Sequence, residues 1–294
     1  MLKLILIITL GSPDVAAIER AYERSLSYSV VERGHVARDL ATVWNAPRMA
    51  GRPYALMKPA SDANVYLRFV QVDAPEDYVP MKSFGWNAIE ILVQDPDALA
   101  ERFRTPDSPF RIVGVPRPLG PDSPIRAMQV VGPANEVLYL TRIPPGSGRH
   151  AAQTYVDRPF IMIVGGPDFD AMRKFYSDTF GLAVSAASKA RMTVLNKAHG
   201  FDIETTHPLS MARVSPEYSI EIDGYPKTAT SRSTRSGELP PAVATVGFEV
   251  DSLEPSKGSL LAPARTVAAA PYNGRRVGVV RGAAGELLEL VETK

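Results

Sequence analysis

The chain has 294 residues, of which 45% are hydrophobic and 22% charged, and its 33 basic and 32 acidic side chains leave almost no net charge. This composition is ordinary for a soluble globular protein, and the charge balance disfavours a nucleic-acid partner, which would need a basic surface. The chain contains no cysteine, which excludes disulfides, thiolate zinc sites and a cysteine nucleophile, and which is consistent with a cytoplasmic location.

The first segment, Met1–Leu10, is apolar enough to be mistaken for the core of a signal peptide. It aligns, however, with the interior segment Pro159–Val164, which cannot be a signal. We therefore expect a first β-strand here. No apolar run approaches the roughly 18 residues needed to cross a bilayer, so the sequence predicts no membrane association.

The chain repeats itself. Residues 7–15, IITLGSPDV, reappear as residues 161–169, IMIVGGPDF, and the same offset places Tyr22 on Tyr176. A second echo relates 134–140, ANEVLYL, to 284–290, AGELLEL. A period of half the chain indicates duplication of one unit, because solenoid repeats are about 20 to 50 residues long.

Each half begins with a strand, a turn and a helix. The apolar spacing predicts helices over 15–26 and 169–180, with Asp14 and Asp168 as N-caps that accept a free backbone amide. Later elements follow the same order in both halves. The remaining expected strands are 29–36, 65–72, 86–93, 111–115, 126–143, 242–250, 275–280 and 286–291, with a helix over 95–103 and a short crossover over 251–256.

Each half therefore contains two modules of the order βαβββ. The segment 144–149, PPGSGR, is typical of a linker, since its prolines and glycines interrupt both kinds of periodicity. We expect two domains of two modules each, an N-terminal domain over residues 1–145 and a C-terminal domain over residues 155–294.

The module openings and endings carry a family resemblance. Residues 245–251, TVGFEVD, and 285–290, GELLEL, resemble the vicinal oxygen chelate superfamily, which includes glyoxalase I, the bleomycin-resistance proteins and the extradiol dioxygenases. The resemblance covers nearly the whole chain and implies an α+β fold with four βαβββ modules paired into two open-barrel domains. It implies a central cavity, whereas the chemistry stays open because one fold hosts many functions.

The resemblance also defines where a metal would be held. Metal-dependent members place His, Gln or Glu on a module's first strand and Glu on its last strand, and the matching positions here are Ile7, Arg68, Ala88, Tyr139, Ile161, Glu221, Thr245 and Glu289. None is a histidine, and the chain's four histidines, His35, His150, His199 and His207, fall elsewhere. We expect no transition-metal cofactor. Glu221 and Glu289 could still hold a hard divalent ion.

Glu90 is the first candidate for catalysis. It shares a strand face with Ala88, and burial would raise its pKa, which suits a general acid or base. Tyr139 or Arg68 could then stabilise an enolate oxygen. The alternative is structural, with Glu90 in a buried ion pair with Arg68 or Arg126.

The candidate substrate-binding residues are Arg68, Trp86, Tyr66 and Met128, although ordinary core packing also explains the apolar ones. The sequence predicts that a monomer or homodimer binds a small aromatic or carbonyl-bearing molecule in a cavity of the first half, without a transition metal. Two alternatives stay open. One is a metal-independent lyase or isomerase that uses Glu90 and Tyr139, and the other is a divalent-metal enzyme that uses Glu221 and Glu289.

Overall fold

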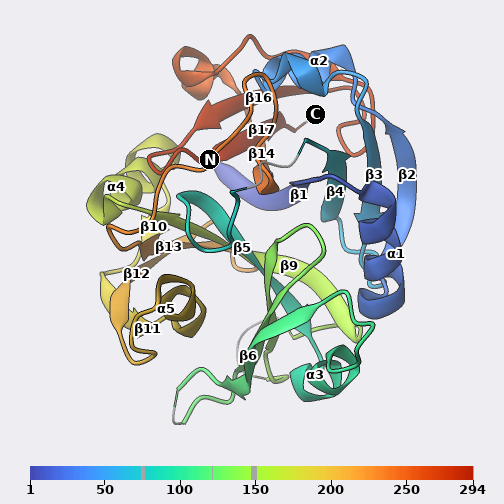
Figure 1. Ribbon diagram of the computed structural model, residues 1–294. Coiled ribbons are helices and arrows are strands. Elements are labelled where there is room, and N and C mark those ends of the chain that lie inside the picture. The colour runs from blue at the N-terminus through green and yellow to red at the C-terminus, as the bar shows by residue number, and fades with distance from the viewer. Residues whose placement is uncertain (74–76, 121, 147–150, 294) are drawn as a thin grey trace.

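A computed structural model describes residues 1–73, 77–120, 122–146 and 151–293. They form two large β-sheets with helices packed beside them (Figure 1). No helix in these ranges is long and apolar enough to span a membrane. The α+β fold with four βαβββ modules is thus confirmed.

The four modules follow one another along the chain. Module 1 comprises β1 (Leu2–Ser12), α1 (Val15–Leu26), β2 (Ser29–His35), α2 (Arg38–Val43), η1 (Pro47–Met49), β3 (Pro53–Lys58) and β4 (Tyr66–Gln71). Module 2 comprises β5 (Gly85–Val93), α3 (Pro96–Phe103), β6 (Arg111–Pro118), β7 (Arg126–Val131) and β8 (Val137–Arg142). Module 3 comprises β9 (Val156–Gly166), α4 (Phe169–Phe180), β10 (Ala183–Val184), β11 (Ser188–Arg191), α5 (Thr193–His199), β12 (Thr206–Arg213) and β13 (Ser219–Gly224). Module 4 comprises β14 (Ala242–Val250), η2 (Glu254–Ser259), β15 (Arg265–Val267), β16 (Arg275–Arg281) and β17 (Leu287–Glu292).

The helix starts repeat as the duplication predicts. The Asp14 carboxylate accepts the amide of Ala17 at 2.9 Å, and the Asp168 carboxylate accepts the amide of Ala171 at 2.9 Å. The helices that follow are α1 and α4. Both aspartates are confirmed as N-caps, because each satisfies an amide that has no partner within its helix.

Each sheet combines one module from each half. In the first sheet, called sheet I here, the strand order is β15-β16-β17-β14-β1-β4-β3-β2, so modules 1 and 4 share it. In the second, sheet II, the main path is β10-β12-β13-β9-β5-β8-β7-β6, so modules 2 and 3 share it. The sheets therefore do not follow the expected division into 1–145 and 155–294.

The pairing of first strands explains this difference. β1 runs antiparallel to β14, with Ile7 opposite Gly247, and β5 runs antiparallel to β9, with Glu90 opposite Ile161. All four first strands are almost entirely buried. Because they share one apolar pattern, the local sequence does not say which of them pair.

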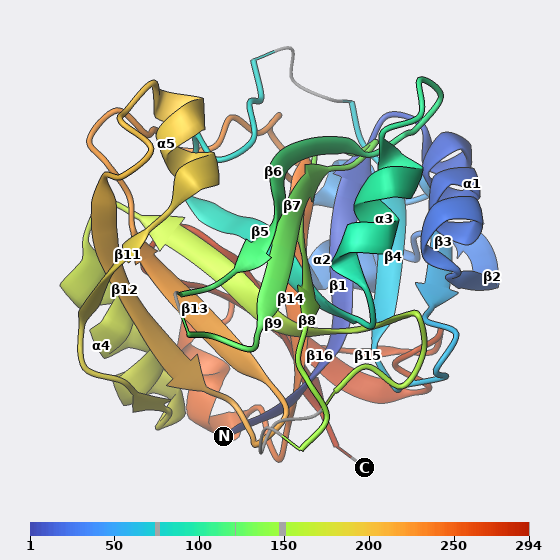
Figure 2. The ribbon, with the colours of Figure 1, turned by 90° about the horizontal axis from the view of Figure 1, so that it is seen from below.

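Both sheets curl so that their two edges approach each other. The short helix α2 follows the edge strand β2 of sheet I and contacts β15 and β16 at the other edge. In sheet II, α5 follows β11 and contacts β6, the far edge strand (Figure 2). Each sheet thus forms an open barrel that a short helix bridges. The opposite faces contribute to one large apolar core, together with α1, α3 and α4.

A buried hydrogen bond joins the two modules of each half. The Tyr22 hydroxyl donates to Glu136 at 2.7 Å, and the Tyr176 hydroxyl donates to Glu286 at 2.8 Å. Each tyrosine lies in the first module's helix, and each glutamate precedes the second module's last strand. Burial is the main cause that raises the pKa of both glutamates to about 7. The duplicated sequence therefore reproduces the same contact twice.

Removing one of these hydrogen bonds should be measurable. We expect Tyr176→Phe to lower the free energy of unfolding by about 1–3 kcal/mol, because Glu286 keeps its burial and loses one of its donors, retaining the amide of Ala284. Urea unfolding of the variant checks this value. Tyr66→Phe is the matched control, since Tyr66 is only half-buried in β4, and equal losses in both variants would contradict the assignment.

Candidate functional site

In sheet I, the position expected for a metal contains a buried ion pair. The Arg68 guanidinium lies 3.7 Å from the Glu289 carboxylate, and their side chains are 1% and 0% exposed. Tyr272 connects them, because its hydroxyl accepts from Arg68 at 2.7 Å and donates to Glu289 at 2.6 Å. Burial also raises the pKa of the Tyr272 hydroxyl. The hydroxyl therefore stays protonated and can keep both contacts.

Two further residues complete this cluster. Arg68 donates to the Thr9 hydroxyl from Nε at 3.1 Å and from Nη2 at 2.8 Å. The Trp44 indole donates to Glu289 at 2.6 Å, and its ring lies 4.7 Å from the guanidinium. We call these five residues the sheet I cluster. A metal does not fit it, because the guanidinium would repel a cation and Glu289 is already engaged.

Sheet II instead has an open cavity at the corresponding place. It measures about 410 Å³ and is lined by Glu90 of β5, Tyr139 of β8 and Glu221 of β13. Glu90 is opposite Tyr139 in the parallel pairing of β5 with β8, and Glu221 is opposite Ile163 in the pairing of β13 with β9. The structure thus brings three of the sequence candidates to one wall.

Other residues from both halves line the same cavity. Polar groups come from β6, β7, β11 and α5, and apolar ones from α5, β12 and the chain around them. The lining includes Arg117, Gln129, Lys189, Thr193, Met192, Val194 and Leu209. Arg117 donates to the Thr193 hydroxyl at 2.5 Å, which connects β6 to α5. The cavity therefore has an acidic wall and cationic side chains elsewhere on its lining.

The acidic wall continues to Asp223, two residues beyond Glu221. These carboxyl groups share a hydrogen bond, and Asp223 is 2% exposed. Burial raises the pKa of Asp223 to about 8. Burial and the negative charges of Asp223 and Glu90 raise the pKa of Glu221 well above its ordinary value. The pair therefore retains a proton near neutral pH.

Thr141 and Tyr139 add two hydroxyl groups to the wall. The Thr141 hydroxyl donates to Glu90 at 2.5 Å. Burial, followed by the three carboxylates, raises the pKa of Tyr139 well above its ordinary value, so its hydroxyl stays protonated. In contrast, Oδ1 of Asp223 is buried and has no hydrogen-bond partner among the described residues. A buried acceptor without a partner is unusual and costs free energy.

Several sequence expectations are wrong in placement. Arg68 is in sheet I and pairs with Glu289, so it neither contacts Glu90 nor lines the Glu90 cavity. Arg126 pairs with Asp97 at 2.5 Å. The alternatives in which Arg68 or Arg126 neutralises Glu90 are therefore not observed.

The expected apolar wall also differs. A register shift between Trp86 and Ala88 turns Trp86 into the common core, where its indole donates to the carbonyl of Leu287 at 2.8 Å. Met128 is in the same core because it alternates with the cavity residue Gln129. Tyr66 belongs to sheet I, where the Lys58 ammonium lies 5.1 Å from its ring.

The expected carboxylate pair for a metal is not formed. Glu221 belongs to sheet II, whereas Glu289 belongs to sheet I, because the second half is divided between the sheets. Among the described ranges, no group of three or more His, Cys, Asp or Glu is placed to hold a metal ion. His150 lies outside the described residues. In sheet II the other expected ligand positions are Ala88 and Ile161, which have no donor atom, and Tyr139, which offers only a phenol, so the described residues do not fit a transition metal.

Three residues at the site, Asp223, Arg117 and Thr193, were not among the candidates from the sequence. Asp223 could have been found, because it shares a strand face with Glu221 by the two-residue alternation. Arg117 and Thr193 could not, because α5 has only 7 residues and β6 joins the cavity through the curl of the sheet. Only the tertiary structure brings these two residues to the cavity.

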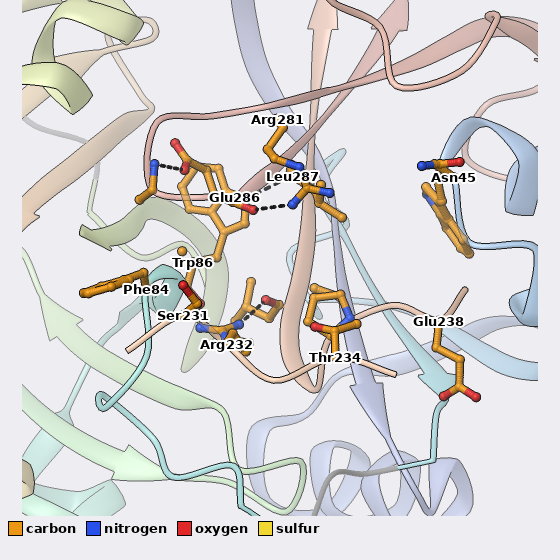
Figure 3. A pocket seen from close by; sticks show the side chains of 17 residues that line it. Asn45, Phe84, Trp86, Ser231, Arg232, Thr234, Glu238, Arg281, Glu286 and Leu287 are labelled. Carbon is orange, nitrogen blue, oxygen red and sulfur yellow. Dashed lines mark hydrogen bonds between the residues drawn. The ribbon is translucent and has the colours of Figure 1, made fainter. Parts of the chain in front are cut away.

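A second, smaller pocket of about 270 Å³ lies between the β16–β17 hairpin and residues 231–240 (Figure 3). Arg232 lines this pocket. Its guanidinium donates to the hydroxyl of Ser83 at 3.0 Å and to the carbonyls of Trp86 at 2.5 Å and Val243 at 2.8 Å. Ser83 and Trp86 belong to the sheet II side, and Val243 belongs to sheet I. Arg232 thus links the two sheets by hydrogen bonds, which is a structural role.

Comparisons with solved structures agree with this architecture. A singly substituted variant of glyoxalase I from Zea mays matches with a TM-score of 0.68 and 14% identity, covering 98% of this chain and 92% of that chain. Glyoxalase I from Zea mays itself matches with a TM-score of 0.66 and 12% identity, covering 98% and 92%. A proposed dioxygenase from Bacillus subtilis subsp. subtilis str. 168 matches with a TM-score of 0.62 and 10% identity, covering 99% and 85%.

No protein-family model matches the chain, and no curated protein matches it. The structural likeness extends over nearly the whole chain at low identity. It establishes the fold: the chain has the two-sheet, four-module vicinal oxygen chelate fold seen in glyoxalase I. The resemblance noted in the sequence is thereby confirmed at the level of fold.

Proposed function

We propose that this protein binds a small aromatic or carbonyl-bearing molecule in the sheet II cavity. The observation that carries the proposal is the contrast between the two sheets. Glu90, Tyr139 and Glu221 line a cavity of about 410 Å³ in sheet II, whereas the corresponding place in sheet I is filled by the sheet I cluster. Cavities of roughly 300–1,000 Å³ are typical of small-molecule sites.

The lining suits such a molecule. Tyr139, Gln129 and Arg117 can donate hydrogen bonds to a carbonyl oxygen. Met192 and Val194 offer apolar contact for an aromatic ring. Polar recognition at one side and apolar contact at another would orient the ligand.

A second candidate is proton transfer on the bound molecule, as in a metal-independent isomerase or lyase. The observation that favours it is the carboxyl pair, since the pKa of Asp223 is about 8 and that of Glu221 is also raised. The ionised member of this carboxyl pair would take a proton from the carbon next to the carbonyl. The electrons of that C–H bond would move to the carbonyl oxygen, and the Tyr139 hydroxyl would donate to the resulting enolate.

An aromatic ketone tests both candidates. We expect acetophenone to bind saturably to the protein, as followed by NMR, and Tyr139→Phe to weaken binding about fivefold or more because it removes a donor. If the protein transfers protons, it will speed the exchange of the ketone's methyl protons in D₂O, and Glu221→Gln will abolish that exchange.

Tyr272→Phe is the matched control, because Tyr272 holds the equivalent relation to a carboxylate in sheet I. Equal weakening in Tyr139→Phe and Tyr272→Phe would contradict a site in sheet II. If acetophenone binds saturably but its methyl protons do not exchange faster, the proposed binding stands and the proposed proton transfer is contradicted.

A further inference from the structure

We propose that the ligand of the sheet II cavity carries a protonated amine, which binds at Glu221 and Asp223. This inference rests on the proposed function, because it names the chemistry of a molecule that the cavity would hold.

The wall of the sheet II cavity is rich in carboxyl groups. Glu221 lines the cavity, Asp223 lies on the same strand face, and Glu90 adds a third carboxyl group nearby. Like charges at such short range are unfavourable in a buried place unless a proton or a cation compensates them. One acceptor, Oδ1 of Asp223, has no partner within the described part of the chain. A donor with a positive charge would satisfy both needs.

The two sheets differ in how their buried carboxyl groups are compensated. There, the Arg68 guanidinium neutralises Glu289 directly at 3.7 Å and through Tyr272. In sheet II, no cationic side chain of the described residues contributes to the pKa of Glu221 or Asp223. Arg117 donates to Thr193, and Arg191 pairs with Glu204 at 2.7 Å. Among the described residues, the fold thus supplies a cation to Glu289 in sheet I and none that acts on Glu221 or Asp223 in sheet II.

An ammonium group fits this wall better than a metal ion does. The described residues contain no group of three carboxylates or histidines placed around one point, and divalent ions need several oxygen ligands at fixed distances. An ammonium group needs fewer oxygen ligands. Its three donors suit the carboxyl group of Glu221 and the Tyr139 hydroxyl, which line the cavity together with Met192 and Val194, and Asp223 follows Glu221 on the same strand face.

Three probes of equal size test the inference: benzylamine, benzyl alcohol and benzoate. Each is titrated into the full chain by calorimetry and NMR. We expect benzylamine to bind with 1:1 stoichiometry and at least about tenfold more tightly than the other two. Glu221→Gln should weaken benzylamine binding about tenfold and leave the benzyl alcohol affinity unchanged. Glu204→Gln is the matched control, since Glu204 is exposed and pairs with Arg191, and it should change neither affinity.

The other outcomes are distinguishable. If benzyl alcohol or benzoate binds 1:1 and at least as tightly as benzylamine, the amine is wrong while the proposed cavity stands. If Ca²⁺ competes with benzylamine, binds more tightly and depends on Glu221, an inorganic cation replaces the amine. If no probe binds saturably at millimolar concentrations, both the inference and the proposed function are contradicted. Thermal unfolding shows whether Glu221→Gln is folded, and we expect it to be at least as stable as the natural chain because it removes a like charge.

Discussion

Replacing Arg68 by methionine is expected to lower the free energy of unfolding by about 3–5 kcal/mol, because it leaves the buried Glu289 carboxylate without its cation. Tyr272 and Trp44 would still donate to Glu289, but hydrogen bonds from neutral groups compensate a buried charge only in part. Urea unfolding at neutral pH measures the difference.

Two variants make this prediction specific. Arg126→Met removes an ion pair with Asp97 whose side chains are 33% and 53% exposed, so it should cost under about 1 kcal/mol. The double variant Arg68→Met with Glu289→Leu should recover part of the loss, because neither charge is then buried alone. A loss for Arg68→Met no larger than that for Arg126→Met would show that the sheet I cluster is not a coupled unit.

Raising the pH from about 6.5 to 8.5 is expected to lower the free energy of unfolding by about 4 kcal/mol. The groups responsible are Glu136 and Glu286, with a pKa of about 7, and Asp223, with a pKa of about 8. Each pKa is raised above its ordinary value by burial, so the folded state binds more protons than the unfolded chain. Their stabilising effect is therefore present at lower pH and disappears as the pH passes the folded pKa.

The chosen pH window isolates these groups. Burial lowers the pKa of His207, which makes stability rise with pH, but only up to the unfolded pKa of about 6.5. The double variant Glu136→Gln with Glu286→Gln should remove about half of the slope above pH 6.5, because an amide does not titrate while Asp223 still does. Urea unfolding at three pH values measures this. A stability that is flat or rises over the window would contradict the assignment of the buried glutamates.

Much of the fold could be predicted from the sequence because the signals are local and repeated. Asp14 and Asp168 precede matched helical patterns, and both cap a helix in the structure. The echo that relates Tyr22 to Tyr176 and Glu136 to Glu286 proved to be one buried contact that occurs twice. The choice of partner strands was not predictable, since β1, β5, β9 and β14 are all buried and apolar.

The site residues divide in the same way into those that local patterns predict and those that depend on strand pairing. Alternation along a strand correctly grouped Ala88 with Glu90, and it could have revealed Asp223 beside Glu221. It failed at Trp86, where a register shift in the pairing with β9 reverses the side chain. It also could not separate Glu221 from Glu289, because that depends on which modules share a sheet.

In the proposed arrangement, sheet II holds the ligand site and the sheet I cluster closes the equivalent place. Hydrogen exchange followed by mass spectrometry, with and without saturating benzylamine or acetophenone, tests it most directly. We expect slower exchange in β5, β8 and β13, and unchanged exchange in β4 and β17. Slower exchange confined to β4 and β17 would contradict it, since the ligand would then occupy sheet I.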